Sequence, residues 1–161
     1  MNSLQRYLAT VSGQPSDILP RVPILMQFAA EHIGSNYGAF AADWRVLVEA
    51  NLRCRDDFGF DQVSAISDPY REAQGFGAEI QYIEDHAPCL VRPPLADIHD
   101  LSPLRTDPDP YTSERMYDRL LAVREFQSRV GGECSILGWV EGPAAEAADL
   151  RGVQDFLMDL M

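Results

Sequence analysis

Short apolar runs that alternate with helical patterns constrain this chain most. Three such runs, Pro23–Phe28, Asp61–Ser67 and Cys134–Val140, are short and apolar enough for strands that are buried on both faces. Strands that alternate with helices are typical of a parallel sheet with crossover helices, so the sequence predicts an α/β fold. An open doubly wound sheet and a (β/α) barrel share this alternation, and periodicity does not separate the two.

Start and stop signals place the helices of the first half. Ser3–Val11 predicts a short opening helix. Asp43 can cap a helix with apolar residues at helical spacing, and Gly59 supplies the left-handed residue that commonly ends one. Asp68 stands before a proline, and an acid ahead of a proline at the first helical position is a helix start signal. A short helix that ends near Gly75 should follow it.

The second half begins with less regular patterns. Ala78–Ile83 alternates like a half-exposed strand, whereas the many prolines of Pro88–Pro110 predict an irregular loop. The longest helix should begin at Asp109 and end at Gly131. Its apolar stripe would consist of Met116, Leu120, Val123 and Val130. A turn at Gly142 then leads into an alanine-rich helix.

The charge balance excludes several classes of partner. The chain of 161 residues has 25 acidic and 13 basic residues, which gives a formal net charge of -12. Nucleic acids and anionic membrane surfaces both attract Lys and Arg, so neither partner is expected. The N-terminus has no basic segment followed by a long apolar core, and no stretch approaches the ~20 apolar residues of a membrane span. A cytoplasmic protein is therefore expected.

The cysteines and histidines form no metal-binding pattern. Cys54, Cys89 and Cys134 are widely and unequally spaced, with no C-x-x-C pair and no histidine at a metal-ligand interval. We interpret them as free thiols in a reducing compartment, and no metal site is predicted in this chain. His86 and His99 lie in the proline-rich part of the chain and receive no functional role.

Four segments, read in order, resemble successive signatures of the uroporphyrinogen decarboxylase superfamily. They are Arg21–Ala30, Phe58–Asp68, Ala73–Ile80 and Ile136–Pro143. The resemblance runs from Arg21 to the end of the sequence and is to the N-terminal half of that family. It implies the family fold, which is a (β/α)8 barrel of the TIM type.

The implied barrel is incomplete in this chain. Barrels of this type take ~250 residues, so 161 residues can supply only the first β/α units. Residues 1–22 would form an N-terminal helix and lead-in, and residues 23–161 the first β/α units of a partial barrel. The expected partners are the missing C-terminal half or a second copy of the chain.

The site signatures separate two branches of the family. In the decarboxylase the first-strand signature reads Met-Arg-Gln-Ala-Gly-Arg, and its arginines suit the carboxylates of the tetrapyrrole substrate. The matching stretch here reads Met-Gln-Phe-Ala-Ala-Glu, so Gln27 and Glu31 replace both arginines. Asp68 matches the family aspartate after the second strand, whereas a family tyrosine falls near Asp149, where no tyrosine is present. Porphyrinogen decarboxylation is therefore disfavoured.

The branch that remains comprises methyltransferases that move a methyl group between a corrinoid cofactor and a thiol such as coenzyme M. A zinc ion holds and activates their thiolate. The resemblance places the zinc ligands, a His-x-Cys pair and a later Cys, in the C-terminal half. Zinc, a corrinoid and a corrinoid protein are therefore implied for the complete family member, and the isolated chain is expected to be inactive.

Candidate substrate-binding residues follow from the implied barrel, because barrel enzymes carry their chemistry at the C-terminal ends of the strands. These ends give five candidates: Asp68, Gln27, Glu141, His32 and Trp139. Asp68 could equally cap a helix, and Trp139 could belong to the core. Glu141 could be a solvated turn residue, and His32 an exposed side chain. No catalytic residue is assigned.

Three functions remain open at this stage. The first is a fragment of a methyltransferase in which Asp68 and Gln27 line the pocket. The second is a divergent decarboxylase or other lyase that uses Asp68 to hold a polar substrate. The third is a non-catalytic, truncated barrel that persists only through partners or dimerisation. A continuing reading frame that contains His-x-Cys and a later Cys would favour the first.

Overall fold

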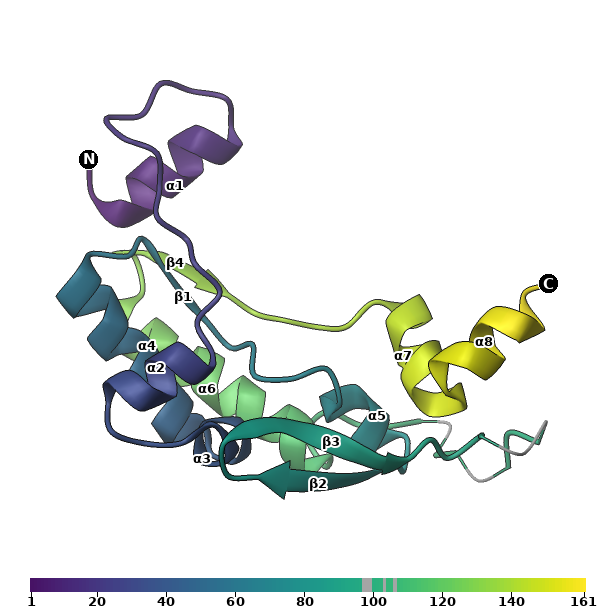
Figure 1. Ribbon diagram of the computed structural model, residues 1–161. Helices are drawn as coiled ribbons and strands as arrows, with labels where there is room; N and C mark the ends of the chain where they lie inside the picture. The colour runs from purple at the N-terminus through teal and green to yellow at the C-terminus, as the bar shows by residue number, and fades with distance from the viewer. Residues whose placement is uncertain (97–99, 103, 106) are drawn as a thin grey trace.

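The chain forms an open crescent in the computed structural model, with α1 (Ser3–Val11) at one tip and α7 (Pro143–Arg151) and α8 (Val153–Asp159) at the other (Figure 1). The described residues are 1–96, 100–102, 104–105 and 107–161. The prediction made for His99 lies outside them. No described helix is long and apolar enough to span a membrane.

Two short parallel strands form the centre of the fold. Strand β1 (Gln62–Ser64) pairs in parallel with β4 (Ser135–Leu137). Helices α4 (Trp44–Phe58) and α6 (Glu114–Val130) pack against each other, α4 also contacts β1, and α6 contacts β4. A parallel pair joined through a helical crossover confirms the α/β fold. The arrangement is consistent with part of a barrel, and the described residues form no closed barrel.

Capping explains why two helices begin and end where the sequence predicts. Asn2 starts α1, since its side chain accepts a hydrogen bond from the Gln5 amide at 2.8 Å, and the Asn2 amide donates to Gln5 Oε1 at 3.1 Å. Asp43 starts α4 by accepting from the Arg45 amide at 2.8 Å, and Gly59 ends it with φ of 64°. The predictions for these two helices are confirmed.

The first predicted strand, Pro23–Phe28, is wrong. Residues 21–25 have no regular structure, and α2 (Gln27–His32) begins inside the predicted strand. The segment makes one backbone hydrogen bond to the start of β1, from the Asp61 amide to the Arg21 carbonyl at 2.8 Å. Its proline, Pro23, has no N–H to extend a ladder. The other two predicted strands exist but shrink to three residues each, β1 and β4.

A β-hairpin includes the first residues, 88–92, of the predicted proline-rich loop, whereas the described residues from 93 to 110 form no helix or strand, as predicted. Strand β2 (Glu79–Ile83) confirms the expected half-exposed strand, but β3 (His86–Arg92) pairs antiparallel with it where an irregular loop was predicted. Pro88 lies at a register shift of this pairing, where a missing N–H does not cost a regular ladder bond. The hairpin docks on α3 (Tyr37–Ala42), because the Gly38 amide donates to the Glu84 carbonyl at 2.9 Å.

Two helices begin later than predicted. Helix α5 (Arg71–Gly75) starts after Tyr70, although it ends at the predicted residue. Asp109 does not begin α6 but closes a turn before it, with the Ser113 amide donating to the Asp109 carbonyl at 2.8 Å. The predicted apolar stripe of α6 is also partly wrong, because Leu120 is exposed. The buried face carries Arg115, Arg119, Ala122, Phe126 and Val130.

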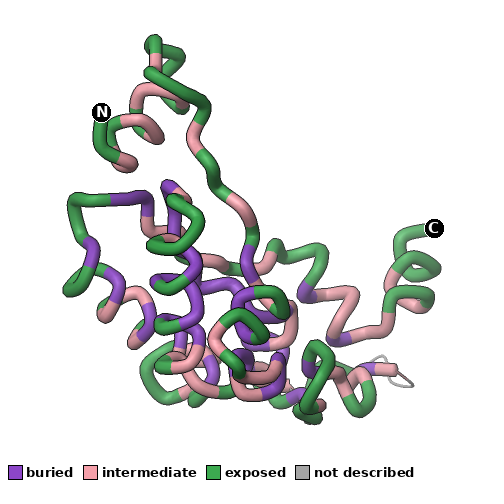
Figure 2. Tube along the Cα trace, turned by 60° about the vertical axis from the view of Figure 1, so that its left-hand side comes forward, coloured by how far each residue is buried: buried purple, intermediate pink, exposed green. Residues whose placement is uncertain are grey.

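The apolar core lies between α4, α6 and β1. Figure 2 shows buried residues concentrated in this body, whereas α1 and α8 contain none. Cys54 and Cys134 belong to the core, and all three cysteines are free thiols. Burial raises the pKa of both core thiols, which suits a small hydrophobic role. A second, smaller cluster joins α5 to α7 through Ala73 and Leu150.

Candidate ligand-binding site

The segment that follows the C-terminal end of β1 is buried as far as Asp68. The Ala65 amide donates to the Leu137 carbonyl at 2.9 Å, which extends the contact between the two strands beyond β1. Tyr37 donates to the Ser67 carbonyl at 2.7 Å and also contacts the sulfur of Met26 at 3.1 Å. The end of the lead-in segment therefore reaches the end of β1 through Met26, one residue before the predicted site residue Gln27.

The Asp68 carboxylate is fully engaged within the chain. Its Oδ2 accepts from Arg115 Nη2 at 2.6 Å and from Ser67 Oγ at 2.7 Å, and its Oδ1 accepts from the Tyr70 amide at 3.1 Å. The Asp68 side chain is 0% exposed. Burial opposes its ionisation, but the Arg115 guanidinium and the two other donors hold the pKa of Asp68 below its usual value. Asp68 therefore positions Arg115 and also supports the turn before α5.

Three buried arginines gather around this carboxylate. Arg71 donates to the Ala65 carbonyl at 3.2 Å and to Ser67 Oγ at 3.1 Å. Arg115 and Arg119 lie one turn apart on the inner face of α6. Arg119 donates to the Ala41 carbonyl at 3.2 Å and pairs with Asp118, while Arg115 lies over the Tyr82 ring. Helices α5 and α6 thus both direct cations toward the end of β1.

These arginines carry five nitrogen atoms with no acceptor. They are Nη2 of Arg71, Nε and Nη1 of Arg115, and Nε and Nη1 of Arg119. This statement covers the residues that the structure describes. A buried donor that is left without an acceptor costs about 1–3 kcal/mol, and more when it is charged. The site therefore has unused donor capacity for groups outside the described chain.

A group of carboxyls lies near Arg71. Glu146 of α7 is buried and, like Glu72 of α5, has oxygen atoms without a hydrogen-bond donor within the described residues. Burial and the charges of Glu72, Asp149 and Glu141 raise the pKa of Glu146 to about 8. Burial also raises the pKa of Glu72. Glu146 is therefore mostly protonated at neutral pH in the folded chain.

Of the other predicted site residues, the structure brings only two together. Trp139 and Glu141 come together, since Trp139 Nε1 donates to Glu141 Oε1 at 2.7 Å. Gln27 is exposed on α2, and His32 lies 2.8 Å from Asp57 on the same side as Phe58. Within the described part of the chain, no hydrogen bond or ion pair joins Gln27 or His32 to Asp68. Their role in ligand binding stays a prediction.

Sequence reasoning missed the buried arginines. Arginine is usually a surface residue, so a basic position in a helix is normally assigned to solvent. A signal was nevertheless present, because Arg115 and Arg119 continue the spacing of Ala122 and Phe126 on one helix face. Reading that face as continuous would have placed both cations against the core.

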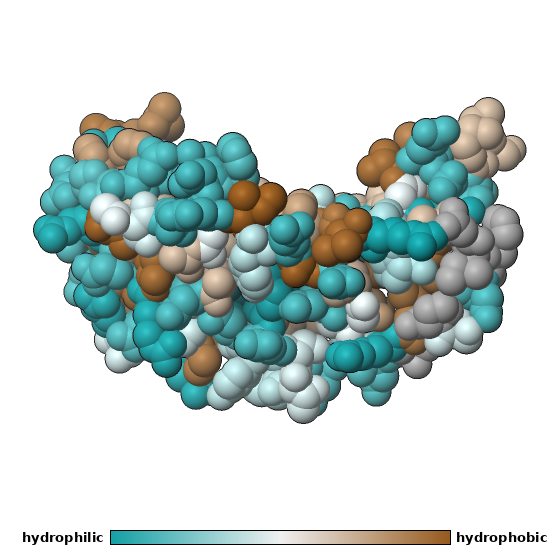
Figure 3. Space-filling view, turned by 60° about the horizontal axis from the view of Figure 1, so that its bottom comes forward, coloured by the Kyte–Doolittle hydropathy of each residue, from teal (hydrophilic) through white to brown (hydrophobic). Residues whose placement is uncertain are grey.

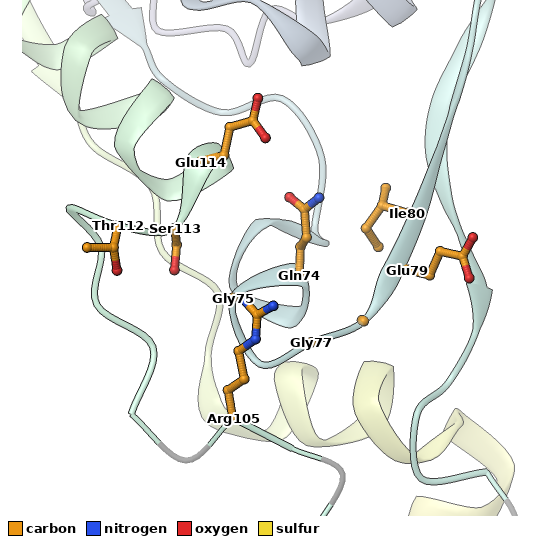
Figure 4. Close-up of a pocket in the computed structure, with 10 residues that line it drawn as sticks. Gln74, Gly75, Gly77, Glu79, Ile80, Arg105, Thr112, Ser113 and Glu114 are labelled. Carbon is orange, nitrogen blue, oxygen red and sulfur yellow. The ribbon is translucent and has the colours of Figure 1, made fainter.

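Two neighbouring clefts open beside the N-terminal turn of α6. The larger, of about 550 Å³, lies between that turn, the end of α5 and the start of β2. Figure 4 shows Gln74 in its middle, with Glu114, Ile80 and Arg105 around it. The second cleft, of about 400 Å³, also includes Gln74 and Glu114, so the two clefts adjoin there. Arg115 lines the second cleft.

Comparison with known proteins shows which family this architecture belongs to. The family model of uroporphyrinogen decarboxylase (URO-D) matches residues 2–161. The chain belongs to this family. Among solved structures, a methyltransferase from Methanosarcina mazei is similar, with a TM-score of 0.83 and 21% sequence identity. The alignment covers 98% of this chain and 48% of the methyltransferase chain, so the chain spans about half the length of that neighbour. No curated protein matches.

Family membership confirms the resemblance that the four sequence segments indicate. The family fold is a TIM barrel, and the parallel strands β1 and β4 are consistent with part of it. Asp68 and Trp139 follow the C-terminal ends of these two strands. Barrel enzymes of the TIM type bind their ligands at such strand ends. In this URO-D chain the Asp68–Arg115 pair and the clefts around α6 are therefore the candidate ligand-binding site.

Proposed function

We propose that this chain is the N-terminal half of a URO-D-family enzyme that transfers a methyl group between a corrinoid cofactor and a thiol. The observation that carries the proposal is the state of the two positions where the decarboxylase has arginines. Gln27 donates to the Glu31 carboxylate at 2.7 Å, so the pair satisfies itself and presents no cation. A substrate rich in carboxylates would meet an acid here. The fold similarity to a methyltransferase supports the same branch.

The role of this half is to build one wall of the site. Asp68 and Arg115 tie α6 to the end of β1, and the barrel would present the adjoining clefts beside the reacting groups. Among the described residues no group of three His, Cys, Asp or Glu side chains could hold a metal ion. The described residues therefore do not fit zinc. In this proposal the thiol-binding ligands come from the complementary half, and the corrinoid arrives on a partner protein.

The proposal is tested by restoring the complementary half. The purified chain is expected to transfer no methyl group from methylcobalamin to coenzyme M with added zinc. Co-expression with a downstream half that contains His-x-Cys and a later Cys should give a complex that does so. Turnover by the chain alone would contradict the proposal that the complementary half supplies the thiol-binding ligands. A stable, zinc-loaded complex without methyl transfer would contradict the reaction.

A second candidate is a divergent lyase that acts on an anionic substrate. The observation that favours it is the set of unpaired guanidinium nitrogens around Asp68, which would suit a carboxylate group. The two candidates differ in the complementary half, because a lyase needs no thiol ligands there. Carbon dioxide release from a carboxylated substrate, measured on the restored complex, would favour this reaction. A non-catalytic barrel fragment would show neither activity in the restored complex.

A further inference from the structure

Helices α7 and α8 form a tip of the crescent that is attached to the body through α7 (Figure 1). The residues of α8 are all at least partly exposed, and this helix packs on α7. The buried residues of α7 are Glu146 and Leu150. Residues 138–142, which connect β4 to α7, have no regular structure, and Val140 within them is 78% exposed. The position of the α7–α8 tip therefore depends largely on what Glu146 and Leu150 contact.

Leu150 attaches α7 to the body by ordinary packing. Its side chain belongs to a small apolar cluster with Ala73 of α5 and Leu95, and its carbonyl accepts from the Leu95 amide at 2.9 Å. On the other side, Arg151 pairs with Asp159 of α8 at 2.8 Å, which joins the two helices of the tip. This cluster is small beside the main core between α4, α6 and β1. One unfavourable group at the same contact is therefore enough to weaken the docking of the tip.

Glu146 is such a group when it is ionised. It is 8% exposed, and neither of its carboxyl oxygens has a hydrogen-bond donor within the described residues. The cation whose charge acts on it, Arg71, donates instead to the Ala65 carbonyl and to Ser67 Oγ. A buried carboxylate without donors is much more costly than a buried neutral carboxyl. The contact between α7 and α5 therefore favours the protonated form of Glu146.

The charges around Glu146 strengthen this preference. Glu72 of α5, Asp149 of α7 and Glu141 of the connecting segment all oppose its ionisation, whereas Arg71 of α5 acts in the opposite direction with a smaller effect. Burial together with these carboxylates raises the pKa of Glu146 to about 8. The side chain therefore keeps its proton across the neutral range as long as the tip is docked.

We propose that protonation of Glu146 controls the docking of the α7–α8 tip: the neutral side chain leaves the tip on α5, and the ionised side chain releases it into solvent. One proton passes from the carboxyl to water on release. The proposal does not depend on either reaction considered above, because it concerns a contact within the chain. The connecting segment carries the predicted site residues Trp139 and Glu141, so release would also change their position.

The direction of the pH dependence follows from the two states of the tip. The pKa of Glu146 is about 8 when the tip is docked, and its ordinary value of 4.5 applies when the side chain is in solvent. Between these values docking takes up a proton, so the ratio of released to docked chains should rise by up to about tenfold per pH unit. Above this window both states are ionised, and the ratio should level off. The tip is therefore expected to be docked in mild acid and increasingly released toward pH 8.

Methyl NMR of the full chain follows the tip without relying on exchangeable protons. Alanine and leucine methyl groups labelled with ¹³C are recorded from pH 5 to pH 9. Ala73 and Leu150 report on the contact of the tip, and Ala122 reports on the main core. The Ala73 and Leu150 signals should shift together as the pH rises toward 8, while Ala122 keeps its position. Unchanged Ala73 and Leu150 signals would overturn the proposal, and so would an equal change of Ala122, because the whole fold would then be responding.

Two glutamine variants identify the group that is responsible. Glu146→Gln cannot ionise, so the Ala73 and Leu150 signals should change much less between pH 5 and pH 9 than in the unmodified chain. Glu49→Gln is the matched control, because Glu49 lies on α4 with 55% of its side chain exposed. It should respond to pH as the unmodified chain does. Equal responses of Glu146→Gln and the unmodified chain would overturn the proposal.

A direct titration decides the question if Glu146→Gln does not fold. The carboxyl carbon of Glu146 is followed by ¹³C NMR in the unmodified chain over the same pH range. A midpoint well above the ordinary value of 4.5 is expected, because the docked tip retains the proton. A midpoint at that ordinary value would overturn the proposal.

Discussion

The Asp68–Arg115 pair joins two segments that are distant in the sequence. Both side chains are almost fully buried, at 0% and 4% exposure. Breaking a buried pair on one side leaves an uncompensated charge and typically costs about 3–5 kcal/mol. Asp68→Asn should therefore lower the free energy of unfolding by roughly that amount. Urea denaturation measures the change.

The control for this variant is an exposed pair on the same protein. Asp56 lies 3.1 Å from Arg55, with 66% of its side chain exposed. Asp56→Asn should change stability by less than about 1 kcal/mol, because solvent screens such a pair. A similar small change in Asp68→Asn would mean that Arg115 finds another partner when Asp68 is neutral.

Glu146 gives a pH dependence of stability at the residue scale. Its pKa is about 8 in the folded chain against an ordinary value of 4.5. At a pH between these two values, the folded chain keeps a proton on Glu146 that the unfolded chain has lost. Stability from this group is full at acidic pH and falls as pH rises through that window, by at most about 1.4 kcal/mol per pH unit. Asp68, whose pKa is lowered, loses stability only in acid, below this window.

Glu146→Gln isolates that effect, because glutamine does not ionise. We expect its free energy of unfolding to change less between pH 5.5 and pH 8 than that of the unmodified chain, with the larger gain of the variant at pH 8. Urea denaturation at the two values checks this. Parallel pH profiles for the two proteins would show that Glu146 finds a donor in the folded chain.

At the scale of elements, the hairpin meets α3 at a glycine. A Cβ atom on Gly38 would lie 2.6 Å from the Ile83 carbonyl oxygen, which is backbone and cannot rotate away. Alanine normally favours a helix by about 1 kcal/mol over glycine, but here the hairpin would have to move. Gly38→Ala should lower stability by roughly 1–3 kcal/mol. Thermal melting measures it.

Gly138 provides the comparison for that substitution. A Cβ atom there would meet nothing within 4 Å, and its φ is not positive. Gly138→Ala should therefore melt within a few degrees of the unmodified chain. An equal loss in both variants would indicate a general cost of replacing glycine and not a close contact between α3 and the hairpin.

The sequence predicts those elements whose signals are local. Asn2, Asp43 and Gly59 fix the ends of α1 and α4 through hydrogen bonds to adjacent residues, so their boundaries could be read directly. The segment Pro23–Phe28 failed because an apolar run becomes a strand only when neighbouring strands pair with it. The strand around Pro88 was missed for a different reason. A proline usually argues against a strand, but here a register shift in the pairing accommodates it.

The site could be predicted only in part for a related reason. Asp68 was found from a family signature, but its partner Arg115 lies 47 residues away and contacts it only after α6 folds back. Glu141 and Trp139 were both proposed at the end of the same strand, and they meet because only one residue separates them. The contribution of Gln27 and His32 depends on surfaces outside the described contacts and stays a prediction.

At the scale of the whole molecule, the central sheet is open on both sides. Beside the two strands the chain donates from the Asp61 amide to the Arg21 carbonyl, from the Leu4 amide to the Glu133 carbonyl, and from the Ser64 amide of β1 to the Asn51 side chain. Figure 3 shows hydrophobic surface at both tips of the crescent and along the hollow between them. Val140 is 78% exposed and Leu157 is 55% exposed. Unpaired strand edges and apolar patches of this kind invite association.

We therefore expect the chain to dimerise, to bind a complementary half or to aggregate. The net charge of -12 slows nonspecific aggregation but cannot pair a strand edge. Size exclusion with light scattering should show species larger than one chain of 18.0 kDa at tens of micromolar. Val140→Lys with Leu157→Lys should shift the distribution toward the monomer, whereas Val91→Lys, which changes a residue of the hairpin that is 53% exposed, should not. A monomer that melts cooperatively without any substitution would mean that the crescent closes its own core, and the half-barrel interpretation would then be wrong.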